Sequence, residues 1–126
     1  MTSWRRERRP VAAVERLPAE ELPARLRVDP GVQILDCRER SEWEAGHIPE
    51  SANQPWHDID RLPDDLDPHR PIAVICRSGP RAATAASLLQ RHGAGHVIHV
   101  VDGGVPTWNR LGEPFATAAG RETAVV

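Results

Sequence analysis

The residues with the clearest chemical meaning lie around Cys76, between a short apolar run and a long stretch rich in alanine and leucine. The apolar run covers residues 71–75 and the amphipathic stretch begins at Arg81, with the sequence Arg-Ser-Gly-Pro at residues 77–80. This pattern predicts a thiol at the end of a buried strand, facing the N-terminus of the next helix. A thiolate or another anion is stabilised there, because the first N–H groups lack intrahelical partners and the helix dipole is positive.

Each residue of this loop has a chemical interpretation and an ordinary structural one. The residues after the cysteine are Arg77, Ser78, Gly79, Pro80 and Arg81. Ser78 can supply a hydroxyl donor and Gly79 allows close approach, although the two alone would also make an ordinary turn. Pro80 has no N–H and suits the first position of a helix. We expect Arg81 to be tied to the helix start and Arg77 to be more exposed. Cys76 could itself be an inert core cysteine, but the flanking arginines favour a charged sulfur.

Length and composition bound the class of protein. The chain has 126 residues, 40% of them hydrophobic, which predicts one domain with a single core. We place this domain at residues 11–115, between a flexible basic N-terminal tail (1–10) and a C-terminal tail (116–126). The formal charge of −2 gives no general reason to expect nucleic acid as a partner. The arginines in the first tail indicate a solvated segment, or one that steers an acidic partner.

Two further features predict the cellular compartment. Residues 11–14 are apolar, but the run is too short for a signal sequence or a membrane span, so we expect a cytoplasmic protein without membrane contact. Cys37 and Cys76 are the only two cysteines. A chain of this length can fold without disulfide bonds, so the low number of cysteines indicates free thiols in a reducing compartment. A disulfide between the two is nevertheless compatible with the sequence.

Short apolar runs alternate with amphipathic or turn-rich pieces, as is typical of parallel strands joined by helical crossovers. The predicted strands cover residues 12–14, 32–35, 52–54, 72–76 and 97–101. The best predicted helix runs from 81 to about 92 and is stopped by Gly93, and another starts near Leu22. Ser41-x-x-Glu44 has the form of a capping box for a very short helix that ends at Gly46. Residues 57–70 are predicted to be a loop with one helical turn at most.

Four segments together resemble the single-domain rhodaneses. They are Cys76–Ala82, which resembles the active-site loop, Ile34–Glu39 with an Asp-x-Arg signature, Glu42–Pro49 with Glu-x-x-x-Gly-His-Ile-Pro, and Val101–Trp108 with Gly-Gly-x-x-x-Trp. They occur in the family's order, and the resemblance as a whole runs from about Val11 to Phe115. One such motif would be weak evidence, whereas four in register with the predicted strands are strong evidence.

The resemblance implies an open α/β fold with a central parallel sheet of about five strands and helices on both faces. It also implies a sulfurtransferase in which Cys76 takes sulfur from a donor such as thiosulfate, releases sulfite and passes the sulfur to a thiophilic acceptor. That acceptor would be cyanide, a thiol or a partner protein. The loop supports both steps, since the positive charge of Arg77 and Arg81 favours a thiolate, and residues 77–81 can surround the anionic persulfide.

Other polar residues have structural interpretations. In the resembled family the positions of Asp36, Arg38 and His47 mostly tie loops together by charge-assisted hydrogen bonds. Cys37 is interpreted as a buried small residue, with a resolving thiol as the alternative. The tryptophans are interpreted as packing elements. His92 and His96 are four residues apart, but the glycines between them should break a helix, so we predict no metal and no cofactor.

Three other functions compete with this interpretation. Phosphatases and arsenate reductases of related architecture use Cys-x5-Arg, whereas four residues separate Cys76 from Arg81, and this tighter loop favours a sulfur atom over a tetrahedral phosphate. Rhodanese-like docking modules typically lack the loop cysteine, which this chain keeps. A persulfide carrier for a partner protein would use the same residues. We expect a monomer.

Overall fold

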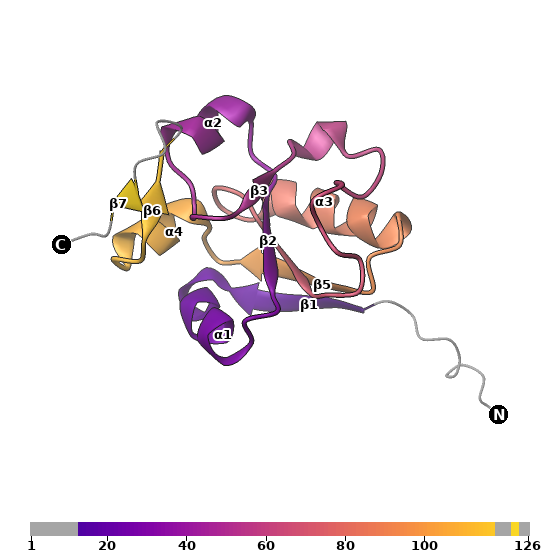
Figure 1. Cartoon of the computed structure of the whole chain (residues 1–126), viewed down its shortest axis with the longest axis horizontal. Helices are drawn as coiled ribbons and strands as arrows, with labels where there is room; N and C mark the ends of the chain where they lie inside the picture. The colour runs from indigo at the N-terminus through magenta and orange to yellow at the C-terminus, as the bar shows by residue number, and fades with distance from the viewer. Residues whose placement is uncertain (1–12, 118–121, 124–126) are drawn as a thin grey trace.

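The computed structural model describes residues 13–117 and 122–123, which form a five-stranded sheet flanked by helices (Figure 1). The strands are β1 (Ala13–Pro18), β2 (Gln33–Asp36), β3 (Ala52–Asn53), β4 (Ile72–Ile75) and β5 (His96–Val101). Their order is β1-β5-β4-β2-β3, and all neighbours are parallel. The predicted fold class and all the predicted strand positions are therefore confirmed, with small differences at the strand ends.

Helices cover both faces of the sheet. They are α1 (Leu22–Val28), α2 (Arg40–Ala45), α3 (Pro80–Arg91) and α4 (Val105–Arg110), with 3-10 turns η1 (Ala19–Glu21) and η2 (Trp56–Asp58). The central strand β4 is buried throughout and divides the core by alternation. Ile72, Val74 and Cys76 pack on the side of α3, whereas Ala73 and Ile75 pack on the side of α1 and α4. Cys76 therefore lies between the sheet and α3.

The small residues of α3 place its N-terminus close to the sheet. Ala82, Ala85 and Ala86 are fully buried against β4 and β5, and only Leu89 adds a large side chain among the buried residues of this helix. Alanine at the contact lets helix and sheet approach closely, because no long side chain separates them. The loop between β4 and α3 is accordingly short.

Three features of the local structure differ from what the sequence predicted. The capping box of α2 is not Ser41-x-x-Glu44 but lies two residues earlier, because Glu39 is still extended and its N–H donates to the Glu42 carboxylate at 3.1 Å. The sequence did not predict α4, in which Pro106 occupies an early helical position where a missing N–H has little cost.

The third difference concerns the predicted C-terminal tail, 116–126. Ala116 pairs with His47 through two backbone hydrogen bonds of 2.9 Å and so belongs to the folded domain. Strands β6 (Phe115–Ala116) and β7 (Glu122–Thr123) form an antiparallel pair. The rest of that segment, and the predicted basic tail 1–10, lie outside the described residues.

Candidate functional site

Cys76 follows β4 directly, and its sulfur is surrounded by the backbone of the loop that leads into α3. Its side chain is buried, with 1% exposure. The N–H of Gly79 donates to Cys76 Sγ at 3.0 Å. Gly79 has φ of +125°, in the region that favours glycine, so this residue makes the turn that points the amide at the sulfur. The predicted position of the thiol at a strand end and a helix start is confirmed.

Hydrogen bonds lower the pKa of Cys76 to about 5. The largest cause is a hydrogen bond from the Cys37 side chain, burial acts in the opposite direction, and the N–H groups of Ala82, Gly79 and Ser78 follow. These interactions favour the thiolate form of the Cys76 sulfur. The sequence predicted stabilisation by the N–H groups of the helix start and by two arginines. The backbone amides contribute as predicted, whereas the largest cause, the neighbouring thiol, was not predicted and the arginines are not among the main causes.

Cys37 occupies the equivalent position at the end of the neighbouring strand β2. It is fully buried, and its backbone N–H donates to Ile75 O at 3.0 Å, which continues the pairing of β2 with β4. The hydrogen bond to Cys76, burial and the nearby negative charges raise the pKa of the Cys37 thiol well above its usual range. Both cysteines are free thiols in the structure. Burial of Cys37 agrees with the prediction, but its contact with Cys76 was missed.

The two arginines of the loop have different environments. Arg81 forms a double ion pair with Glu42 of α2, with contacts of 2.7 and 3.2 Å between guanidinium nitrogens and carboxylate oxygens. This pair lowers the pKa of Glu42 and raises that of Arg81. Arg77 is exposed and forms no ion pair with any residue that the structure describes. The prediction of a structural Arg81 and an exposed Arg77 agrees with this arrangement, although the partner of Arg81 lies on another helix.

Ser78 and Pro80 lie on the outside of the loop. Both are exposed, and Pro80 is the first residue of α3, as the sequence predicted. Arg77 and Ser78 are both exposed, in the same loop as the buried Cys76 sulfur.

Two residues outside the loop hold it in position, and the sequence predicted this role for neither of them. His99 of β5 hydrogen-bonds through Nε2 to the carbonyl of Gly79 at 2.9 Å. Gly104 lies against the loop so closely that an added Cβ would be 1.9 Å from Cys76 O, and Val105 N–H donates to the same oxygen at 2.9 Å. The Gly-Gly segment was a visible signal for the second contact. No comparable signal marked the histidine.

The polar residues assigned to loop packing do make such contacts. Arg38 binds the buried Asp36 carboxylate through several hydrogen bonds, the shortest of which is 2.7 Å, and also donates to the carbonyl of Gly46. His47 stacks on Trp43, with ring centroids 3.7 Å apart, and hydrogen-bonds to the carbonyl of that residue. These residues join β2 to α2 and the segment after it.

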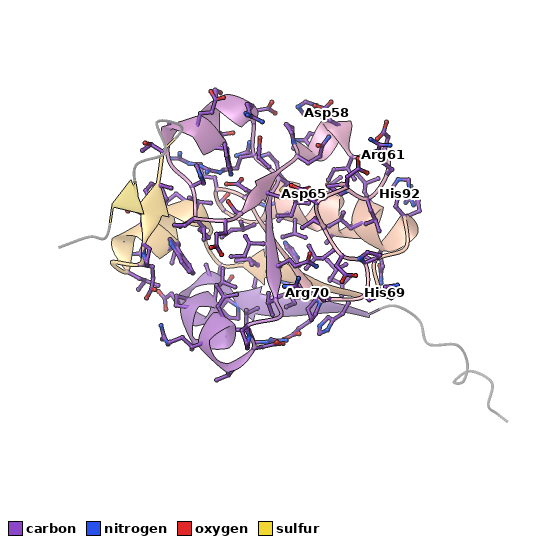
Figure 2. The ribbon with its side chains drawn as sticks, in the orientation of Figure 1. Asp58, Arg61, Asp65, His69, Arg70 and His92 are labelled. Atoms are coloured by element: carbon purple, nitrogen blue, oxygen red, sulfur yellow. The ribbon has the colours of Figure 1, made fainter. Side chains whose placement is uncertain are left out.

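Other parts of the described chain offer less chemistry. A groove of about 890 Å³ is lined by residues such as Trp43, Ile48 and Trp108, but by none of residues 76–81. Among residues 13–117 and 122–123, no group of three or more His, Cys, Asp or Glu side chains could hold a metal ion. Figure 2 shows His92 near the C-terminal end of α3, and His96 belongs to β5, so no single helix aligns the two histidines. Within the same residues, no helix has the length and apolar character needed to cross a membrane.

Comparison with known proteins agrees with this geometry. The model of the rhodanese-like domain family matches residues 18–111. A sulfurtransferase of Allochromatium vinosum is 31% identical, and the alignment covers 85% of this chain and 99% of that protein. Thiosulfate sulfurtransferase GlpE of Pseudomonas syringae is 33% identical over 84% of this chain and 96% of its own length. The solution structure of a rhodanese-like domain from Anabaena superposes with a TM-score of 0.72, at 31% identity, covering 84% of this chain and 82% of that one.

The chain therefore belongs to the rhodanese-like domain family. Similar proteins of nearly the same length are named sulfurtransferases. The family identity predicted from the four sequence motifs is confirmed.

Proposed function

We propose that this protein is a sulfurtransferase that takes the outer sulfur of thiosulfate onto Cys76 and passes it to a thiophilic acceptor. The observation that carries the proposal is the buried Cys76 sulfur at the end of β4, which accepts the Gly79 N–H at 3.0 Å and has its pKa lowered to about 5. A nucleophilic thiolate is what attack on a sulfur–sulfur bond requires. The names of the relatives support the general class of reaction.

In the first half of the proposed reaction, the Cys76 thiolate attacks the outer sulfur of thiosulfate. A bond forms between Cys76 Sγ and that sulfur, the sulfur–sulfur bond of thiosulfate breaks, and sulfite leaves with the electron pair. The exposed Arg77 and Ser78 are suited to bind the dianionic donor before attack. The product is a persulfide anion on Cys76.

In the second half, an acceptor nucleophile attacks the outer sulfur of the persulfide, and the Cys76 thiolate leaves. The features that favour a low thiol pKa also make Cys76 a good leaving group, because the same hydrogen bonds stabilise the thiolate that departs. In an assay the acceptor would be cyanide. In the cell it would be a thiol or a sulfur-accepting protein. Two free thiols fit a reducing compartment such as the cytoplasm.

The remaining loop residues have supporting roles in this proposal. Gly79 donates its N–H to the sulfur, Pro80 starts α3, and Arg81 fixes the loop to α2 through Glu42. The amides of the loop would stabilise the negative charge that moves to the outer sulfur after transfer.

The test is thiocyanate formation from thiosulfate and cyanide, together with sulfite release. Cys76→Ser should abolish both, whereas Cys37→Ser should keep most of the thiocyanate activity, since a hydroxyl can still donate to the thiolate. Arg77→Ala should raise KM for thiosulfate clearly, with only a small change in the melting temperature. Equal activity in Cys76→Ser and the wild type would remove Cys76 as the nucleophile and end the proposal.

A further inference from the structure

The contact between the two cysteines suggests chemistry beyond sulfur transfer to an external acceptor. Asp36 of β2 is in register with Ile75 of β4, so the next residues, Cys37 and Cys76, follow at the same edge of the sheet. Neighbouring strands are about 4.8 Å apart, which is within the range of about 4.4 to 6.8 Å between the Cα atoms of disulfide-bonded residues. Both side chains belong to the same buried cluster on the α3 side. The backbone therefore already has a spacing that suits a disulfide.

The side chains also meet. Both side chains lie in one buried cluster at matching strand ends, and the pKa shifts of the two thiols, up for Cys37 and down for Cys76, point to an interaction of the Cys37 thiol with the Cys76 sulfur, Sγ. In a persulfide on Cys76 this atom is the inner sulfur. A nucleophile that attacks the inner sulfur expels the outer one, whereas an acceptor that attacks the outer sulfur carries it away.

We propose that Cys37 is a resolving thiol that attacks the inner sulfur of the Cys76 persulfide and releases the transferred sulfur as hydrosulfide. This activity rests on the proposed function, because the persulfide must form first. It would make the protein a sulfide-releasing enzyme when no external acceptor is present.

The step balances without any further reagent. The Cys37 sulfur loses its proton and bonds to Cys76 Sγ, the bond between Sγ and the outer sulfur breaks, and the outer sulfur leaves with the electron pair as hydrosulfide. The two cysteine sulfurs are oxidised to a disulfide, and the sulfane sulfur is reduced to sulfide. An external dithiol would reopen the disulfide and restore the starting state by thiol–disulfide exchange.

The Cys37 thiol is kept protonated while Cys76 is a thiolate, and this effect weakens once Cys76 carries the transferred sulfur. While Cys76 is a thiolate, the hydrogen bond to it and its charge are among the causes that keep Cys37 protonated. After sulfur transfer the negative charge moves to the outer sulfur, so both causes weaken and burial is the main one that remains. Cys37 thus becomes more acidic and more nucleophilic in the state that it is proposed to resolve.

The test is a single-turnover reaction of the full chain. Reduced protein without oxygen is mixed with thiosulfate and no acceptor, and sulfite, hydrosulfide, intact mass and a non-reducing peptide map are measured. The wild type is compared with Cys37→Ser and Cys37→Ala at pH 8, where Cys76 should be ionised in all three proteins, and thermal unfolding shows that each variant is folded. A wild-type sample without thiosulfate controls for oxidation by air.

The proposal predicts equal amounts of sulfite and hydrosulfide from the wild type, a mass lower by two hydrogens, and a linked peptide that joins Cys37 to Cys76. Both variants should release sulfite but no hydrosulfide, and should keep one sulfur on Cys76 that cyanide removes. A wild type that releases sulfite and holds a stable sulfur on Cys76 would overturn the inference while leaving the proposed function intact. The same disulfide without thiosulfate would also overturn it. Absence of sulfite from all three proteins would overturn the proposed function and this inference together.

Discussion

Replacement of Cys37 by alanine removes the donor that contributes most to the low pKa of Cys76, which is about 5. A hydrogen bond to a charged group contributes about 1.5 to 3 kcal/mol, and about 1.4 kcal/mol corresponds to a tenfold change in an ionisation constant. Loss of this donor should therefore move the midpoint of thiolate formation from about 5 to roughly 6 to 7. The backbone N–H donors remain, so the midpoint should not return to that of a free cysteine.

The assay is the rate of alkylation of Cys76 by iodoacetamide as a function of pH, with the modified residue identified by peptide mapping. At pH 5.5 the thiolate fraction should fall from roughly three quarters in the wild type to between about 3% and 25% in Cys37→Ala. The alkylation rate at that pH should fall about 3- to 25-fold, with little change at pH 8. The sign follows from the charge, since removal of a donor to the thiolate disfavours the ionised form.

Cys37→Ser is the matched control, because its hydroxyl can still donate to the Cys76 sulfur. Its alkylation profile should lie between those of the wild type and the alanine variant. A Cys37→Ala profile that overlays the wild type would refute the reasoning, since it would mean that the neighbouring thiol does not stabilise the thiolate.

Three further predictions test other parts of the structure. Gly104→Ala should lower the stability by about 1 to 3 kcal/mol and reduce thiocyanate formation, because its Cβ would lie 1.9 Å from a loop carbonyl, whereas Gly95→Ala, with its nearest contact at 3.7 Å, should change neither. His99→Ala should shift the alkylation midpoint upward, because the Gly79 peptide loses its 2.9 Å contact, and His92→Ala at the end of α3 should not. The folded-state pKa of Glu15 is lowered to about 2, mainly by its arginine partner, so its stabilisation should be present above pH 4.5 and lost as the pH falls toward 2. Since this side chain is 34% exposed, Glu15→Gln should lower stability at pH 7 by about 1 kcal/mol or less in urea unfolding, and an unchanged difference at pH 2 would contradict the assignment.

The parts of the fold that the sequence predicted best are those where one pattern excludes the alternatives. The continuous apolar run before Cys76 predicted a central strand, and the alanine-rich stretch after Pro80 predicted a helix close to the sheet. The turn residues between them placed the thiol at their junction. The capping box of α2 was misplaced because the sequence allows two boxes, Ser41-x-x-Glu44 and Glu39-x-x-Glu42. Only the extended backbone of Glu39 shows that the second one forms.

The contacts that tune the site could not be predicted in the same way. The position of Cys37 at a strand end indicated burial, but its contact with Cys76 depends on β2 lying next to β4, which is a property of sheet order. His99 belongs to a strand that is otherwise mostly apolar, and its reach to Gly79 depends on the tertiary placement of the loop. The position of Cys76 at a helix start predicted backbone donors, but the side-chain donor that contributes most to the low pKa comes from another strand.

The central claim is that Cys76 carries the transferred sulfur, and peptide mapping of thiosulfate-treated Cys37→Ser protein tests it most directly, because this variant cannot resolve the persulfide through a second thiol. The account predicts one added sulfur on Cys76, which cyanide removes as thiocyanate, and none in Cys76→Ser. Sulfite release without any sulfur on Cys76, or an added sulfur at another residue, would contradict it.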